Sequence, residues 1–89
     1  MDFEWDPEKA ASSLKDHGVS FEEASEVFAD FLSSTTPDPD HSESEHRMLI
    51  FGQTLAYRHL VVSFTERGAR IRIISAREMT RHERQAYEQ

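Results

Sequence analysis

The chain has 89 residues, enough for one domain with a single small core, and it contains no cysteine, which excludes disulfide bonds and thiolate metal sites. Residues 1–46 hold thirteen acidic residues against two lysines, a balance of −11, whereas residues 47–89 hold eight arginines against four glutamates, a balance of +4. No apolar run approaches the roughly 18 residues of a membrane span and no signal peptide opens the sequence, so we expect a soluble, cytoplasmic domain.

The first half of the sequence predicts a short strand and two helices. Phe3 and Trp5 alternate with acidic residues, which favours a strand that turns both rings to the core. Asp6-Pro7 then begins a helix, because aspartate caps free N–H groups and proline fits the first helical position, and His17-Gly18 ends it. The apolar stripe of this helix is Ala10, Ala11 and Leu14. A capping box, Ser20-Phe21-Glu22-Glu23, opens the second helix, whose apolar positions are Phe21, Ala24, Val27 and Phe28.

The second half predicts a sheet and a closing helix. The polar stretch 33–46 begins with residues that can extend as a strand and continues as a loop at Pro37-Asp38-Pro39-Asp40. Three apolar runs follow, at residues 48–51, 60–65 and 71–74, and predict an antiparallel meander with a tight hairpin loop at Arg67-Gly68-Ala69. A second capping box, residues 80–83, opens a C-terminal helix. The expected fold is a single α+β domain: an antiparallel sheet of three to four strands, packed by two N-terminal helices and closed by the C-terminal one.

The segment from Thr65 to Arg77 carries four of the eight arginines, alternating with isoleucines. An arginine-rich strand in an acidic protein indicates a local anion site or a partner-binding face, because a guanidinium bonds two phosphate oxygens at once and stays charged. Side chains two apart share a face of a strand, so Arg70 and Arg72 project together, and Arg77 joins Ile71 and Ile73 if the strand stays regular. The alternative is a solvated face with no ligand.

The sequence also resembles a known family over nearly its whole length. The matching residues are Phe3-Glu4-Trp5-Asp6-Pro7-Glu8-Lys9-Ala10, His17-Gly18-Val19-Ser20-Phe21-Glu22-Glu23-Ala24, His41-Ser42-Glu43, Thr65-Glu66-Arg67 and Ile71-Arg72-Ile73-Ile74-Ser75-Ala76-Arg77. They resemble the BrnT family, the toxins of bacterial type II toxin–antitoxin pairs. The resemblance implies a RelE-like fold and a metal-independent endoribonuclease that inhibits translation and growth. One departure lies in residues 52–59, where the family more often has a glycine before the arginine that is Arg58 here.

The same resemblance implies the partners. A BrnA-type antitoxin with a ribbon-helix-helix DNA-binding region would neutralise the toxin, as a heterotetramer that represses its own operon. Operator DNA would then be bound only through the antitoxin, because this chain has a net charge of −7 and no basic helix. Neither a membrane nor a cofactor is expected.

Cleavage of RNA without a metal needs a base for the 2′-OH, cations for the phosphorane and an acid for the leaving 5′-oxygen. The candidate catalytic residues are Arg67, Arg72, Arg77, His17 and Glu66, and the candidate substrate-binding residues are Lys9, Arg70 and Tyr87. His17 at a helix C-terminus is a proton donor, a phosphate contact or only a capping residue. Glu66 is a general base or a cross-strand ion pair, and Lys9 reaches the site or is solvated. Tyr87 positions a base or packs its helix on the sheet.

Two other readings compete with the enzyme. The run His41-Ser42-Glu43-Ser44-Glu45-His46 is rich in ligand types, but it lacks the helical i, i+4 histidine pair of a zinc site and lies in a polar loop, so we expect no metal there. A non-catalytic interaction module, a degenerate toxin whose basic sheet docks an antitoxin-like partner, would share the arginine strand.

Overall fold

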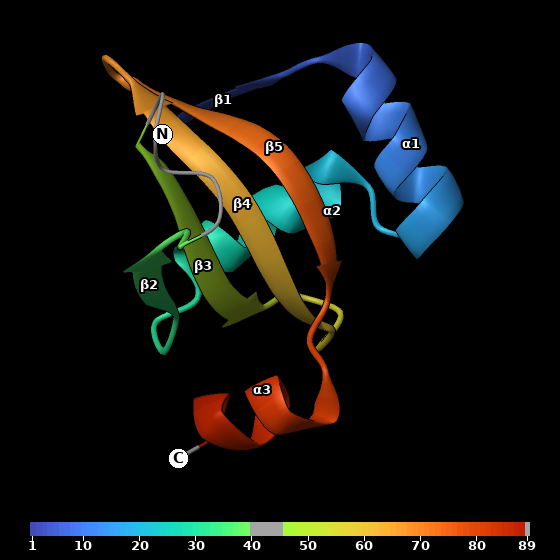
Figure 1. Cartoon of the computed structure of the whole chain (residues 1–89), viewed down its shortest axis with the longest axis vertical. Coiled ribbons are helices and arrows are strands. Elements are labelled where there is room, and N and C mark those ends of the chain that lie inside the picture. The colour runs from blue at the N-terminus through green and yellow to red at the C-terminus, as the bar shows by residue number, and fades with distance from the viewer. Residues whose placement is uncertain (40–45, 89) are drawn as a thin grey trace.

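Five strands form one sheet in the computed structural model, which describes residues 1–39 and 46–88. The strands are β1 (Asp2–Trp5), β2 (Ser34–Pro37), β3 (Arg47–Gln53), β4 (His59–Arg67) and β5 (Arg70–Glu78). Their order across the sheet is β1-β5-β4-β3-β2 (Figure 1). The antiparallel meander β3–β4–β5 confirms the three predicted strands, and its last hairpin turns through Gly68, whose φ of 60° lies in the left-handed region that glycine tolerates.

The sheet differs from the expected one in size and direction. It has five strands rather than three to four, and it is mixed, because β1 pairs in parallel with β5 while every other pair is antiparallel. β1 comes first in the sequence, yet it completes the edge beside the last strand. That placement brings Glu4 opposite Arg72, a pairing that local sequence patterns do not reveal.

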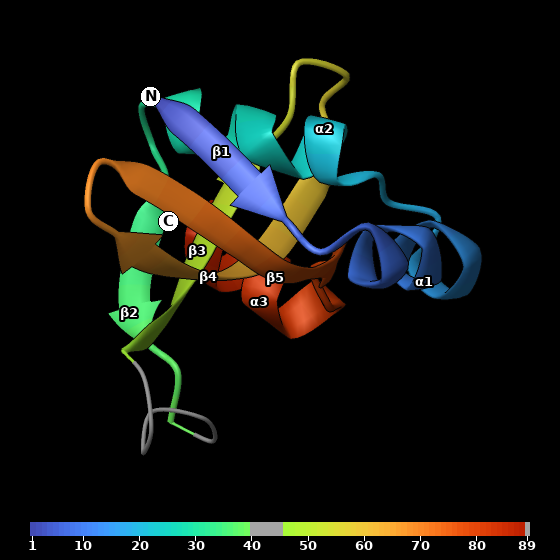
Figure 2. The same ribbon diagram turned by 90° about the horizontal axis from the view of Figure 1, so that it is seen from above.

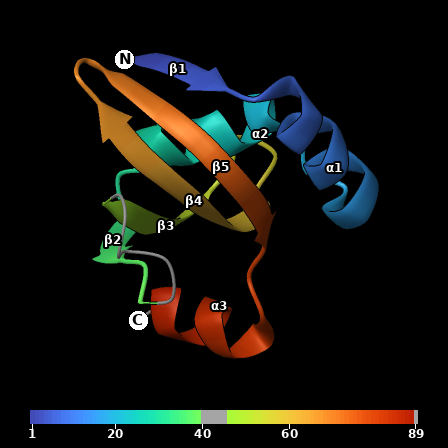
Figure 3. The same ribbon diagram turned by 45° about the horizontal axis from the view of Figure 1, so that its top comes forward.

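The helices lie on different sides of this sheet. They are α1 (Pro7–His17), α2 (Phe21–Ser25), which continues as the 3-10 helix η1 (Glu26–Ala29), and α3 (Arg81–Tyr87). α2 and α3 lie on opposite faces of the sheet, and α1 runs beside β5 (Figure 2). α3 lies beyond the end of the sheet opposite the β4–β5 hairpin (Figure 3). No helix in the described residues has the length and apolar character needed to cross a bilayer.

The core fills the space between the sheet and α2 with η1. Its fully buried large side chains are Val19, Phe21, Val27, Leu60, Val62 and Ile73. Aromatic rings from four elements complete it, with ring centroids of Phe28 and Phe64 4.9 Å apart, and those of Trp5 and Phe21 5.9 Å apart. Phe3 and Trp5 therefore belong to the core, as the alternation of residues 2–6 predicts.

The two predicted capping boxes have different outcomes. In α3 both halves form, because Thr80 accepts from the backbone N–H of Glu83 and Glu83 accepts from that of Thr80. At α2 only Ser20 caps; the Glu23 carboxylate instead accepts from Arg58 at 2.7 Å and from the Thr54 hydroxyl at 3.2 Å. A charged partner across the fold has displaced a local contact.

Candidate active site

Of the predicted apolar stripe of α1 only Ala10 packs against the core, and the helix turns a mainly polar face toward the sheet. Ala11 and Leu14 are exposed, and the buried residue of the helix is Ser13. Its hydroxyl oxygen lies 2.9 Å from the Val19 carbonyl oxygen and 3.2 Å from that of Ala76 on β5. This buried hydroxyl shares its hydrogen between two carbonyl oxygens, so directional hydrogen bonds hold α1 against β5 in addition to packing.

Both ends of α1 are held in place. At the start, Pro7 takes the first position and the Asp6 carboxylate accepts the Glu8 N–H at 2.9 Å. At the end, Gly18 adopts a left-handed conformation with φ 66°, and Arg58 donates to its carbonyl at 3.1 Å. Arg58 also pairs with Glu78 at 2.8 Å and with Glu23 at 2.7 Å, and the bond to Glu78, followed by the charge of Glu23, raises the pKa of its guanidinium. The C-terminal end of α1 is therefore tied to α2 and β5 by one arginine.

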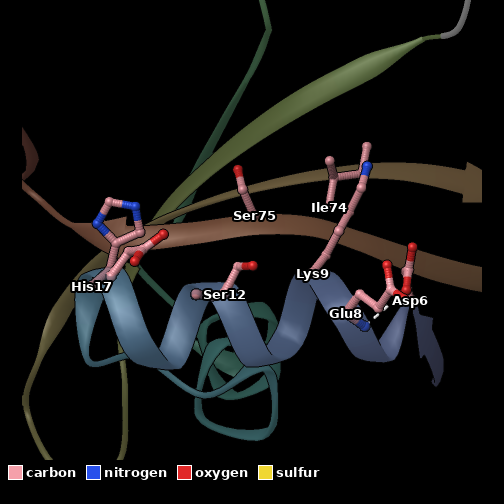
Figure 4. A pocket seen from close by; sticks show the side chains of 9 residues that line it. Asp6, Glu8, Lys9, Ser12, His17, Ile74 and Ser75 are labelled. Atoms are coloured by element: carbon pink, nitrogen blue, oxygen red, sulfur yellow. Dashed lines mark hydrogen bonds between the residues drawn. The ribbon is translucent and has the colours of Figure 1, made fainter.

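A groove of about 360 Å³ runs between α1 and β5. Its lining residues are Asp6, Glu8, Lys9, Ser12, Ser13, Asp16, His17, Ile74 and Ser75. Lys9, Ser12 and His17 rise from one side of α1, beside Ser75 and Ile74 of the strand (Figure 4). Positions 9, 12, 13, 16 and 17 follow the spacing of one helical face, so a polar stripe of α1 forms one side of the groove. This stripe was not predicted from the sequence.

A smaller hollow of about 100 Å³ continues the groove onto the sheet. It shares His17 and Ser75 with the groove and adds Leu49, Val61, Ser63, Ala76 and Arg77. His17 stands where the two spaces meet. Lys9, His17 and Arg77, three residues predicted separately from sequence, thus line one continuous surface.

A β-bulge brings Arg77 to that surface. The register between β4 and β5 shifts at Ser63/Phe64, so Phe64 pairs with Ile73 but Ser63 pairs with Ser75, and Ile74 is extra. Beyond the bulge, Ala76 is the buried residue and Arg77 takes the sheet face on which Arg72 lies. The placement of Arg77 on the face of Ile71 and Ile73 was expected only for a regular strand, and the bulge removes that condition.

Glu83 orients the Arg77 guanidinium. Its carboxylate accepts from Nη1 and Nη2 at 2.7 and 3.0 Å, and the Glu78 carbonyl accepts from Nη1 at 3.1 Å. The hydrogen bond and charge of Arg77 hold the pKa of Glu83 at about 2, and the same pair raises the pKa of Arg77. These bonds use three of the five N–H donors, so within the described structure Nε–H and one Nη2–H stay available as a fork for two oxygens of an anion.

The other predicted arginines gather toward the hairpin end of the sheet. Arg72 donates to the Glu4 carboxylate at 2.8 Å, and Arg70 lies 3.6 Å from the same carboxyl group. The hydrogen bond from Arg72 is the largest cause of the lowered pKa of Glu4. Glu66 and Arg67 are exposed at the end of β4. Neither the groove beside α1 nor the smaller hollow is lined by Glu66, Arg67, Arg70 or Arg72.

Tyr87 also lies elsewhere. Its hydroxyl donates to the Asp30 carboxylate and its ring meets that of His59 edge-on, with centroids 5.5 Å apart. It lines a separate hollow with Ser34, Phe51 and three residues of α3. Burial, and then the bond to Asp30, raise the pKa of Tyr87 to about 12. This contact attaches α3 to the turn after η1.

No three histidine or acidic side chains of residues 1–39 and 46–88 come together as a metal site. The run His41–His46, from which we expect no metal, lies outside the described residues except for His46.

Comparison with known proteins decides the family. The family model described as the ribonuclease toxin BrnT of type II toxin–antitoxin systems matches residues 5–83. The chain belongs to the BrnT family. The crystal structure of the Brucella abortus ribonuclease toxin BrnT, at 1.1 Å resolution, is similar to this BrnT-family fold with a TM-score of 0.67 and 26% identity, covering 91% of this chain and 99% of that one. No curated protein matches the chain. As a type II toxin family, BrnT implies an antitoxin partner.

Proposed function

We propose that this BrnT-family chain is a RelE-like, metal-independent endoribonuclease that cuts RNA in the groove between α1 and β5, acts in the cytoplasm and inhibits translation and growth. The observation that carries the proposal is the convergence of Lys9, His17 and Arg77 on one surface. The two cations and the imidazole can supply the charge stabilisation and the acid that this reaction requires when no metal takes part.

Each residue has a role that its position supports. The free fork of Arg77 binds two oxygens of the scissile phosphate, and Lys9 adds a second positive charge along the same groove. The 2′-hydroxyl loses its proton to solvent as its oxygen attacks phosphorus, the bond to the 5′-oxygen breaks, and the products are a 2′,3′-cyclic phosphate and a 5′-hydroxyl. His17 gives a proton to the leaving 5′-oxygen, and the hydroxyls of Ser12 and Ser75 bind the sugar-phosphate backbone.

The hairpin residues take a secondary role in this scheme. Arg67, Arg70 and Arg72 lie on the same hairpin, where their charge guides the RNA chain toward the groove. Glu66 is exposed beside them and lines neither space, so we do not assign it the proton transfer proposed from sequence. Tyr87 holds α3 in place through Asp30 and thereby supports Glu83, which orients Arg77.

We propose further that a BrnA-type ribbon-helix-helix antitoxin neutralises the toxin in a heterotetramer, and that operator DNA is bound only through it. The family supports an antitoxin, and the net charge of −7 gives this chain alone little attraction for DNA. A degenerate toxin that only binds its antitoxin remains the alternative function, favoured by the ion pair that already engages Arg77.

Cleavage of a fluorescent RNA by the purified chain in the presence of EDTA tests the enzyme. We expect Arg77→Ala to lower the cleavage rate about 100-fold, as removal of one oxyanion-stabilising group does, and His17→Ala and Lys9→Ala to lower it as well. Arg72→Ala should have a smaller effect. Arg84→Ala is the matched control, because Arg84 pairs only with Glu88 on α3 among the contacts described and lies outside the groove. If the wild type and all variants leave RNA intact at background level, and expression alone does not arrest growth, the chain is an interaction module.

A further inference from the structure

Half of the large apolar side chains that are exposed in the described residues surround one groove. Phe31, Leu55 and Tyr57 are 100%, 81% and 78% exposed, and we call them the apolar patch. They line a space of about 310 Å³ together with Glu26, Ala29, Asp30, Gln53 and Thr54. Single exposed apolar residues are ordinary on a protein surface, but three that converge on one groove from two separate segments are typical of a binding site.

Hydrogen bonds close the loop that carries Leu55 and Tyr57. The Thr54 N–H donates to the Arg58 carbonyl oxygen at 2.8 Å, and the Tyr57 N–H donates to the Thr54 carbonyl oxygen at 2.9 Å. The Leu55 N–H donates to the Glu26 carboxylate at 3.0 Å. Tyr57 has a φ of 66°, a left-handed conformation that is unfavourable for an aromatic residue. The fold therefore holds a strained backbone whose visible effect is to present two apolar side chains to solvent.

The turn that carries Phe31 is equally fixed. The Asp30 carboxylate accepts from the Leu32 N–H at 3.0 Å, from the Gln53 N–H at 2.8 Å and from the Tyr87 hydroxyl. The same group thus joins this turn to the end of β3, from which the other segment leaves. A partner that binds here has little loop entropy to overcome, which is the advantage of a pre-organised surface.

The charge at the groove selects the partner. Its lining holds two carboxylates, Glu26 and Asp30, and no lysine or arginine. Carboxylates repel the phosphates of RNA, and a second copy of this chain, with a net charge of −7, would bring further negative charge. A segment with apolar side chains flanked by lysine or arginine complements the groove in both respects.

We propose that the apolar patch is the anchor for the antitoxin: a basic, amphipathic antitoxin segment inserts its apolar side chains between Phe31, Leu55 and Tyr57, and its cations face Glu26. The proposal rests on the antitoxin that a type II family implies, not on RNA cleavage. The patch and the groove beside α1 share no lining residue, so substitutions can separate antitoxin binding from catalysis.

The test measures the Kd between the purified chain and its cognate antitoxin for a Phe31→Ser, Tyr57→Asn double variant. Asparagine tolerates the left-handed conformation at position 57, and Phe31 is fully exposed, so the thermal unfolding midpoint should stay within a few degrees of the wild type. We expect binding about 100-fold weaker, since buried aromatic anchors dominate interfaces. Leu14→Ser is the matched control: Leu14 is 57% exposed outside the patch, and its loss should change Kd less than about twofold.

Antitoxin binding by the double variant as tight as that of the wild type would overturn the proposal. So would a wild-type chain that dimerises alone through the patch in sedimentation, or a double variant that loses RNA binding while keeping the antitoxin. In cells, the double variant should arrest growth even when the antitoxin is present. Because Kd is read without catalysis, a chain that cuts no RNA would refute the proposed function and leave this measurement intact.

Discussion

The ion pair between Arg77 and Glu83 should stabilise the fold in a way that depends on pH. Glu83→Gln removes the charge but keeps a side-chain oxygen that can accept the Thr80 N–H, a bond of 2.8 Å in the wild type. The substitution therefore isolates the two charged bonds to Arg77, at 2.7 and 3.0 Å, from the capping of α3. Loss of this pair also frees the guanidinium that we place on the scissile phosphate.

The size of the effect follows from the pKa of Glu83, which falls from an ordinary 4.5 to about 2. A difference of this size corresponds to roughly 3 kcal/mol between the charged and neutral carboxyl group. The Arg77 side chain is 43% exposed, so solvent screens the pair and we expect about 1–2 kcal/mol of folding free energy. Because the pKa of Glu83 is lower in the folded state than in the unfolded state, the ion pair stabilises the fold above pH 4.5. This contribution to the free energy of unfolding is lost as the pH falls toward 2.

Urea unfolding of the wild type and of Glu83→Gln, from pH 7 down to pH 2.5, provides the assay. The difference in the free energy of unfolding should be constant above about pH 5 and shrink steadily below pH 4.5. Glu88→Gln is the control, because the Arg84–Glu88 pair has both side chains more than half exposed and should contribute less than about 0.5 kcal/mol. The reasoning is refuted if Glu83→Gln is as stable as the wild type at pH 7, or if the difference does not change with pH.

Two further predictions concern the core and α3. Gly52→Ala should cost about 1–3 kcal/mol in urea unfolding, because an added Cβ would lie 2.6 Å from Cγ1 of the buried Val27, a stiff side chain that cannot turn away; an unchanged midpoint would contradict this. In a Tyr57→Phe variant, Tyr87 is the only tyrosine, and its phenolate absorbance should appear with a midpoint of about 12. A midpoint near 10 would mean that neither the burial of Tyr87 nor its bond to Asp30 persists in solution.

Local patterns predicted the elements well. The three apolar runs became β3, β4 and β5, and Gly18 and Gly68 stand at left-handed positions where a helix and a hairpin need them. The departure noted before Arg58 has a structural counterpart: Tyr57 adopts the left-handed conformation in which a glycine would be unstrained. Such features depend on neighbours in the sequence, so a single sequence reveals them.

Features that depend on distant partners were not predictable in the same way. The parallel pairing of β1 with β5 joins residues about seventy positions apart. The burial of Ser13 requires a carbonyl of β5, and nothing in the helix itself distinguishes this serine from Ser12. The bulge at Ile74 was decisive for the candidate site, since alternation places Arg77 on the core side and one extra residue reverses that. The polar stripe at positions 9, 12, 13, 16 and 17 was the available signal for the groove.

The fold also explains how an arginine strand persists in an acidic chain. Glu4 faces Arg72 and Arg70, and Glu23 faces Arg58, so carboxylates of the acidic half pair with arginines of the basic half. Arg77 differs, because its partner Glu83 comes from the basic half and binds it end-on. An end-on pair leaves the side of the guanidinium open, and Arg77 lines the same hollow as His17. Acidic and basic residues that are separated in the sequence are thus paired in the fold. The capacity to bind an anion is greatest at Arg77, whose donors are only partly used.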